Sequence, residues 1–259
     1  MSLKYESIIK QMSLEEKALM MSGKNTWETV DFEKYGIPSM AMSDGPHGLR
    51  RQAGAGDHLG LNASLPATCF PTAASVANSW DEILGEEIGT ALAEEAVTMD
   101  VNVILGPGLN IKRSPLCGRN FEYMSEDPYL ISELVVPMVK GIQQSDVAAC
   151  VKHFAANSQE TERLWVDTKV SKQTLEEIYF PGFRAAVQKG GVHAVMGAYN
   201  LLNGEHCCTS KKLLNGTLRR DWGFDGVVVS DWGGVHDTRE AAEAAIDVEM
   251  EVTYDFDQQ

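Results

Sequence analysis

The sequence predicts one α/β domain in which crossover helices join parallel strands, and three observations support this. Short runs of β-branched and apolar residues alternate with longer segments of helical periodicity. No internal repeat, low-complexity tract or Pro/Ser-rich linker divides the 259 residues. Nearly every strand-like run ends in polar or charged residues. This rhythm is typical of parallel sheets, and from the pattern alone a barrel and a doubly wound sheet both remain open.

Six short runs are the expected strands of the sheet. Residues 227–229 are three consecutive valines, which is typical of a strand buried on both faces. The expected strands lie within residues 37–44, 101–110, 147–154, 193–200, 226–232 and 246–250.

The expected helices are marked by their caps. Ser13 with Glu16 forms a capping box, and Gly23 is expected to end that helix. Ser79 with Glu82 is expected to open a second helix. Further helices are expected from Asp127–Pro128, from about Ser171, near Leu213 and from a capping box of Asp237 with Glu240. Pro137 and Pro181 lie inside helical patterns and are expected to kink or break them.

Composition excludes several classes of function. The chain carries 37 acidic and 22 basic residues, a net charge of −15, without any Lys/Arg-rich run. We therefore expect no binding to nucleic acid or to an anionic membrane surface. The sequence shows no signal peptide and no apolar run long enough to cross a membrane. Five cysteines without CxxC spacing predict free thiols and a cytoplasmic location, although a secreted enzyme that has lost its leader fits equally.

The polar residues at the strand ends form the candidate site. In a parallel α/β fold, the carboxyl ends of the strands are where binding sites are built. A single Asp after a strand is more often a helix cap than a catalytic group, but five such endings converge in this fold. They are Asp44, Asn110, Lys152 with His153, Tyr199 with Asn200, and Asp231.

Cofactor and metal sites are not expected. The glycine turn 106–110 lacks the spacing of a dinucleotide-binding motif, and no phosphate-binding loop is present. None of the six histidines pairs with a carboxylate at helical metal-ligand spacing. A Schiff base on Lys152, as in barrel aldolases, stays open at this point. His153, Arg50 and Arg119 fit hydrogen bonding to hydroxyl groups equally well.

Five segments in sequence order resemble the N-terminal barrel of glycoside hydrolase family 3, of the β-glucosidase type. They are MSDGPHGLR (42–50), GRNFEYMSEDP (118–128), CVKHFAANSQE (150–160), VMGAYN (195–200) and GFDGVVVSDWGG (223–234). The resemblance covers roughly residues 13–250. It implies a (β/α)8 TIM-like barrel and hydrolysis of O-glycosyl bonds by a retaining double displacement. Residues 1–259 would be this barrel domain, incomplete at its C-terminal end because only six or seven strands can be counted.

The resemblance also implies roles for individual residues. Asp231 matches the family's nucleophile, and Asp44 matches the acid that binds hydroxyls of the sugar. The other matched positions are Arg119, Lys152 and His153, which would clasp the sugar ring; Met196 and Tyr199, which would form the wall beneath it; Trp232, an aromatic platform near the leaving group; and Arg50, in the surrounding shell.

A buried strand gives the nucleophile of such an enzyme the fixed position that it needs. The glycines after Asp231 leave room for a sugar, and the Trp232 indole offers a flat face for stacking. We expect Lys152 and the arginines to keep the Asp231 carboxylate ionised, as nucleophilic attack requires.

The acid/base is where the chain departs from the family pattern. In β-glucosidase-type relatives, a downstream α/β domain supplies that Glu, and this sequence stops at Gln259. Single-domain N-acetylhexosaminidases use a KHFPGHG segment instead, whereas residues 152–158 read KHFAANS. We therefore expect a truncated piece of a longer enzyme that acts on terminal β-linked glucose or a similar sugar, with a disordered tail at 251–259. A sugar-binding or inactive module is the main alternative, followed by an N-acetylhexosaminidase and a Lys152 aldolase.

Overall fold

The centre of the molecule is a curled sheet of five parallel strands, as a computed structural model describes it for residues 4–54, 56 and 61–250. The expected tail at 251–259 lies outside these residues. Every neighbouring pair in the sheet is parallel, which confirms the α/β prediction. The strands follow the order β1 (Met42–Ser43), β2 (Val103–Ile104), β3 (Ala148–Phe154), β5 (Ala194–Gly197) and β8 (Val227–Val229).

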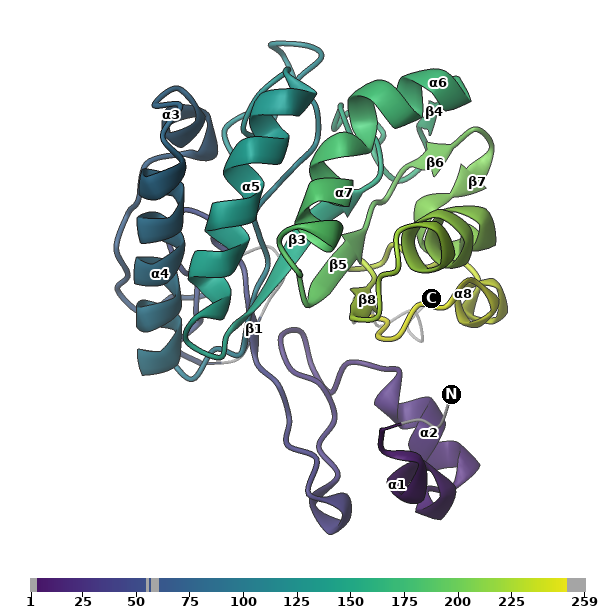
Figure 1. Cartoon of the computed structure of the whole chain (residues 1–259). Coiled ribbons are helices and arrows are strands. Elements are labelled where there is room, and N and C mark those ends of the chain that lie inside the picture. The colour runs from purple at the N-terminus through teal and green to yellow at the C-terminus, as the bar shows by residue number, and fades with distance from the viewer. Residues whose placement is uncertain (1–3, 55, 57–60, 251–259) are drawn as a thin grey trace.

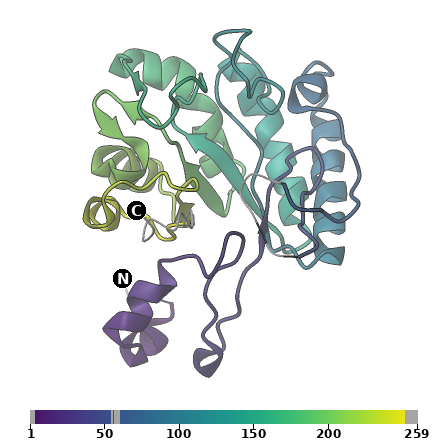
Figure 2. The same ribbon diagram turned by 180° about the vertical axis from the view of Figure 1, so that it is seen from behind.

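Helices pack around the outside of this sheet, and Figures 1 and 2 show α4, α5 and α7 side by side along one flank. The α-helices are α1 (Glu6–Gln11), α2 (Leu14–Met20), α3 (Ala73–Ala77), α4 (Glu82–Thr98), α5 (Pro128–Gln143), α6 (Lys172–Thr174), α7 (Pro181–Gln188) and α8 (Thr238–Ala244). Two π-helical segments, η2 (Leu175–Tyr179) and η4 (Lys212–Asp221), and two 3-10 turns, η1 (Glu33–Tyr35) and η3 (Cys207–Thr209), complete the set. None of the described helices is long and apolar enough to cross a membrane.

A second, small sheet follows the carboxyl ends of β3 and β5. Its strands are β4 (Asp167–Thr168), β6 (Leu201–Leu202) and β7 (Glu205–His206). β6 lies between the other two, parallel to β4 and antiparallel to β7. These two-residue strands are too short to give an alternating pattern, so the sequence did not predict them.

Isolated backbone pairs close the gap between β8 and β1. Val248 pairs with Val229 of β8, and Glu249 pairs with Ser22. The hairpin of residues 22–30 then reaches β1 through the pairs Gly23–Thr29 and Glu28–Ala41. The interior of this ring is filled by apolar side chains from the sheet and from the closing segments, including Trp27, Met42, Leu105, Cys150, Met196, Val229, Val248 and Met250. The expected strand at 246–250 is therefore a short pairing segment.

Two predicted helix boundaries are wrong. Gly23 does not end the first helix, because α2 stops at Met20 and the Gly23 N–H donates to the Glu249 carbonyl oxygen in the ring closure. Ser79 does not cap α4. Asp81 is the cap, since its Oδ1 accepts hydrogen bonds from the N–H groups of residues 83 and 84. The capping box of Ser13 with Glu16 is confirmed.

The two helical prolines behave differently from each other. Pro137 does not break α5, which runs continuously from residue 128 to 143 with Pro137 buried. The missing N–H costs one backbone hydrogen bond, and the packing of a largely buried helix against its neighbours offsets this loss. Pro181 does divide its segment: it starts α7, directly after the π-helical turn η2. At this first helical position its lack of an N–H is harmless.

Candidate active site

A cavity of about 130 Å³ lies where the carboxyl ends of the strands meet. It brings together all the residues matched by the family resemblance except Arg50, which contacts Asp44 from outside. Asn110 and Asn200, which were also expected at this face, do not line it: the Asn110 side chain bonds the backbone of His153, and Asn200 donates to the Ala155 carbonyl oxygen. We call it the mouth pocket. Its lining residues are Trp27, Asp44, Arg119, Lys152, His153, Arg163, Met196, Tyr199, Asp231 and Trp232.

Two strand ends place the central polar side chains. Lys152 and His153 are consecutive on β3, where alternate residues normally face opposite sides. The pairing register of β3 with β5 shifts between Val151 and Phe154, and both polar side chains line the pocket. Asp231 follows β8 by two residues in a turn with little space. A Cβ atom at Gly234 would stand 3.0 Å from the Asp231 carbonyl oxygen, a close contact that a glycine avoids.

Lys152 is the centre of a buried ion network. Its Nζ lies 3.0 Å from Oδ1 of Asp44 and 3.5 Å from Oε2 of Glu122, and only 3% of the side chain is exposed. Burial lowers the pKa of Lys152, but the two carboxylates outweigh it and raise that pKa above its usual value. Arg119 forms an ion pair with Glu122, and Arg50 Nη2 lies 3.1 Å from Asp44 Oδ2.

The two carboxylates of this network are held ionised. Burial alone would raise the pKa of Asp44, yet Lys152 and Arg50 more than compensate and lower it. The same balance, with Lys152 and Arg119 as the cations, lowers the pKa of Glu122. The Asp44 side chain is 36% exposed, so it is the partner that is accessible to a ligand. Glu122 is buried and serves to hold Arg119 and Lys152 in place.

His153 is neutral, with its proton on Nδ1. Its Nε2 lies 2.7 Å from Nη2 of Arg119, and a guanidinium can only donate, so Nε2 accepts. Nδ1 then carries the hydrogen and lies 3.1 Å from the Tyr123 hydroxyl. Burial and the charge of Arg119 hold the pKa of His153 well below its usual value, in agreement with this tautomer.

Asp231 presents one free oxygen. Its Oδ1 accepts a hydrogen bond of 2.9 Å from the Trp232 N–H, whereas its Oδ2 accepts none from the described residues. The neutral His153 ring is 3.6 Å from Oδ2, but the nitrogen that faces it carries no hydrogen. Burial raises the pKa of Asp231 above its ordinary value. Arg119 and Lys152 favour the ionised form, as expected, but burial is the larger effect.

Sequence reasoning missed three residues of this site. Trp27 comes from the closing hairpin, and its ring lies 5.1 Å from that of Trp232, centroid to centroid. Arg163 lies over the Tyr199 ring at 4.6 Å. Glu122 lies in the segment 118–128, three residues after Arg119. This spacing suits an ion pair and is the sequence signal that could have identified Glu122. Trp27 and Arg163 lie outside any strand pattern.

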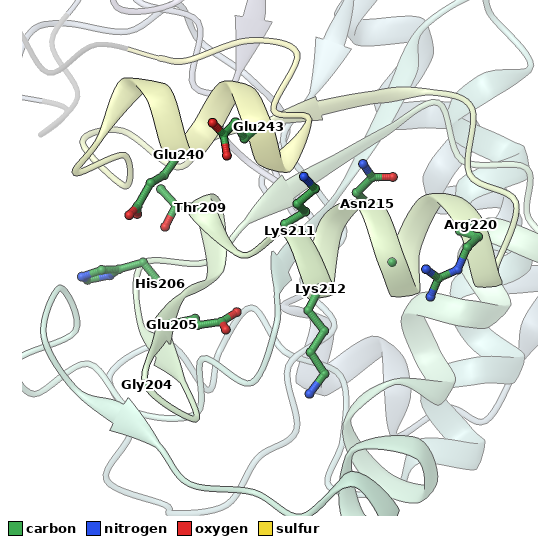
Figure 3. A pocket seen from close by; sticks show the side chains of 11 residues that line it. Gly204, Glu205, His206, Thr209, Lys211, Lys212, Asn215, Arg220, Glu240 and Glu243 are labelled. Atoms are coloured by element: carbon green, nitrogen blue, oxygen red, sulfur yellow. The ribbon is translucent and has the colours of Figure 1, made fainter.

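A larger cavity of about 800 Å³ lies between β7, η4 and α8, and we call it the outer groove. Figure 3 shows that its charged side chains point in different directions: Lys212 points away from α8, whereas Glu240 leaves α8 on the side of Thr209 and His206. Several are already paired, since Glu205 accepts a hydrogen bond from Ser210 and Arg220 pairs with Asp221. Across the described ranges, no group of three or more His, Cys, Asp or Glu residues is arranged to hold a metal ion.

Comparison with known proteins identifies the family to which this chain is related. The sequence profile of the glycosyl hydrolase family 3 N-terminal domain matches residues 7–254. The thermostable β-glucosidase B of Acetivibrio thermocellus is 53% identical over 254 residues, which are 98% of this chain and 34% of that protein. The exo-α-(1→6)-L-arabinopyranosidase of Bifidobacterium longum is 47% identical over 251 residues, 96% of this chain and 33% of that protein. The chain thus spans about a third of the length of these relatives.

Solved structures agree with this relationship. The β-glucosidase 3B of Thermotoga neapolitana, in complex with glucose, superimposes with a TM-score of 0.88 at 41% identity, over 94% of this chain and 36% of that chain. The β-glucosidase of Kluyveromyces marxianus, in complex with glucose, superimposes with a TM-score of 0.91 at 38% identity. The match covers 98% of this chain and 30% of that chain. These similarities confirm the TIM-like barrel, here an incomplete one. The chain belongs to glycoside hydrolase family 3, as an N-terminal barrel domain.

Proposed function

We propose that this chain is the nucleophile-bearing barrel of a retaining glycosidase that acts on terminal β-linked glucose or a similar sugar. One observation carries the proposal: Oδ2 of Asp231 is buried at the pocket, and none of the described residues donates a hydrogen bond to it. A buried carboxylate oxygen that lacks a donor is costly, and such groups in native proteins call for a functional explanation. An oxygen that must bond to carbon in each cycle is such an explanation.

The proposed reaction has two displacements. Oδ2 of Asp231 attacks the anomeric carbon, its bond to the leaving oxygen breaks, and an acid protonates that oxygen as the alcohol departs. Water then attacks the same carbon, loses a proton to the conjugate base, and frees the Asp231 carboxylate. Asp44, Lys152 and Arg163 supply the acceptor and the donors for the sugar hydroxyls. These groups are charged, and hydrogen bonds to charged groups are the stronger kind.

The acid for the first step is proposed to come from outside these 259 residues. An acid must hold a proton near neutral pH, whereas the pKa values of Asp44 and Glu122 are both lowered. Their ion pairs with Lys152 and Arg119 account for this. A downstream α/β domain, as in the β-glucosidase branch of the family, is the proposed source.

The test is to trap the glycosyl–enzyme ester. The substrate is a 2-deoxy-2-fluoro-β-glucoside with a dinitrophenolate leaving group. This leaving group departs without an acid, so the 259-residue chain itself can be used. We expect its mass to increase by one fluoroglucosyl unit, located on the peptide that contains Asp231. Asp231→Asn should remain unlabelled. Label on another residue would move the nucleophile, while saturable sugar binding without any label would favour a sugar-binding module without turnover.

The aldolase alternative loses support in the structure. An imine-forming lysine needs a neutral amine, and the pKa of Lys152 is raised because Asp44 and Glu122 surround its ammonium group. Treatment with borohydride and a carbonyl compound is therefore expected to leave the mass of the Lys152 peptide unchanged. A reduced adduct there would replace the glycosidase proposal.

A further inference from the structure

Asp231 forms no salt bridge with the two cations that lie deepest in the mouth pocket. Lys152 and Arg119 both line that pocket, and both favour the ionised form of Asp231 from a distance. Among the described residues, the side chain that approaches the Asp231 carboxylate in ion-pair geometry is His153, which is neutral. Buried charges of opposite sign normally pair directly. Another group must therefore hold these two cations elsewhere.

Glu122 contacts both cations. Nε of Arg119 donates to Oε1 of Glu122, and Nζ of Lys152 lies 3.5 Å from Oε2. Each carboxylate oxygen thus faces a different cation. The Glu122 side chain is buried and does not line the pocket, so a sugar in the pocket does not reach it.

The bond to Glu122 determines where the Arg119 guanidinium points. With Nε bound to Glu122, Nη2 of Arg119 lies 2.7 Å from Nε2 of His153. The same His153 nitrogen lies 3.6 Å from Oδ2 of Asp231. One imidazole nitrogen is therefore the neighbour of both the guanidinium and the free oxygen. The guanidinium is one contact away from Oδ2, and Glu122 is what keeps it there.

The other carboxylates near these cations are engaged differently. Oε1 of Glu160 lies 3.9 Å from Nε of Arg119, but it accepts a hydrogen bond from Asn157, and Oε2 is bound to Arg163. Asp44 contacts Lys152 and is partly exposed to the pocket. Across the part of the chain that the structure describes, Glu122 is the carboxylate that pairs with both Arg119 and Lys152.

We propose that Glu122 is a positioning residue that holds Arg119 and Lys152 away from Asp231 and so keeps Oδ2 free to attack. This inference rests on the proposed function of Asp231 as the nucleophile. An oxygen that accepted a charged hydrogen bond would have to give it up before it bonds to carbon, and this would slow the reaction. At their present distance the two cations favour the carboxylate form and leave its second oxygen unoccupied.

The kinetic test is Glu122→Gln, which keeps the shape of the side chain and removes its charge. Arg119 is then expected to turn to Oδ2 of Asp231. We expect the maximal rate of labelling by the fluoroglucoside to fall by about ten- to a hundredfold, the factor that corresponds to one charged hydrogen bond. The pH of half-maximal rate should also fall, by about 1, because a directly paired carboxylate is harder to protonate. A purely structural defect would lower the rate without moving this pH.

Two variants are the controls. Glu122→Asp keeps the charge, so the pH of half-maximal rate should stay at the wild-type value. Glu95 is a half-buried carboxylate outside the pocket that accepts hydrogen bonds from Thr68. Glu95→Gln should leave both the rate and this pH unchanged. An unchanged pH of half-maximal rate in Glu122→Gln would overturn the positioning role.

A titration without substrate separates this proposal from the proposed function. The ¹³C chemical shift of the Asp231 carboxyl carbon reports its ionisation in the free protein, and Asp231→Asn assigns the signal. If its midpoint falls in Glu122→Gln although the wild type is never labelled, the catalytic proposal fails and the positioning role stands. If the wild type is labelled but the signal titrates identically in both proteins, the positioning role is wrong.

The same titration identifies the cation that moves. The substitution of Glu122 leaves every titratable side chain that lines the pocket with Asp231 in place: Asp44, Arg119, Lys152, His153, Arg163 and Tyr199. Arg119→Gln combined with Glu122→Gln removes the ion pair as a whole, so it leaves no buried charge without its partner and carries the test if the single variant does not fold. Its midpoint should lie at the wild-type value or above. A midpoint below the wild-type value would overturn the proposal.

Discussion

The mouth pocket and the outer groove are both lined by acidic and basic side chains, and they differ in almost everything else. The groove encloses about 800 Å³ and the pocket about 130 Å³. In the pocket, Lys152 is buried, and its Nζ lies 3.0 Å from the carboxylate of Asp44 and 3.5 Å from that of Glu122. In the groove, the charges are directed apart or pair with sequence neighbours, as Arg220 does with Asp221 (Figure 3).

The site in this molecule is therefore marked by charged groups that converge away from water, and not by the volume of its cavity. Charges that face solvent interact weakly, because water screens them. Charges removed from water shift each other's pKa values. Five groups with shifted pKa values belong to the pocket or its wall: Asp44, Glu122, Lys152, His153 and Asp231. Matched substitutions in the mouth pocket and in the outer groove test this contrast.

The largest expected effect is that of Asp231→Asn. We expect the rate of labelling by the fluoroglucoside to fall by a factor on the order of 10⁴ or more, because the nucleophile is lost. Folding should be unaffected or slightly favoured, since burial penalises the charge that the amide removes. Glu243→Gln in the outer groove is the control and should retain the wild-type rate. If both variants lost the same fraction of the labelling rate, the mouth pocket and the outer groove would not differ in function.

The second effect concerns the leaving group. On the 259-residue chain we expect dinitrophenyl β-glucoside to react slowly and cellobiose not measurably. Acid assistance contributes roughly 10²–10⁴ in rate, and an alcohol leaving group needs it whereas a dinitrophenolate does not. The two substrates are compared on one preparation, with Asp231→Asn as the blank. Rapid hydrolysis of cellobiose would mean that an acid exists within these residues.

The third effect is on stability. Lys152→Met should lower the free energy of unfolding by about 3–5 kcal/mol, because it leaves Glu122 buried with one cation fewer. Lys212→Met in the outer groove should change it by less than about 0.5 kcal/mol, since Lys212 is exposed. Urea unfolding of the three proteins measures both values. If the two variants lost similar amounts of unfolding free energy, burial of the ion network would not contribute to stability.

The smallest effect is a difference in acid sensitivity: we expect the labelling rate to decline at a higher pH than the free energy of unfolding. Labelling requires ionised Asp231, whose pKa is raised, so the rate should already decline above pH 3.8 as the pH falls. Asp44 and Glu122 have pKa values lowered from 3.8 and 4.5, so their contribution to stability is complete above those ordinary values and is lost as the pH falls through the lowered ones. Labelling rates and urea unfolding from pH 7 to 3 test this order. Parallel loss of both would contradict it.

The sequence predicted the pocket better than its surroundings, for a physical reason. Asp44, Lys152 and Asp231 directly follow or lie in buried strands, and parallel strands bring their ends together whatever the loops do. Trp27 reaches the pocket through backbone pairs with residues distant in sequence, which leave no periodic pattern. Asp81, not Ser79, caps α4. The two polar residues are separated only by Trp80, and which of them bonds the start of the helix depends on local backbone geometry.

The ring closure has a consequence for how the protein is made. Ser22 pairs with Glu249, one of the last described residues. The segment around Ser22 therefore has no backbone partner there until residue 249 has been synthesised. Contacts between residues so far apart carry a large loop-closure entropy and slow folding. A nascent chain on the ribosome can form α4 and α5 while the barrel is still open. The wall that Trp27 and Trp232 build together is therefore assembled late, and competence to bind a ligand is acquired only after nearly the whole stretch has been synthesised.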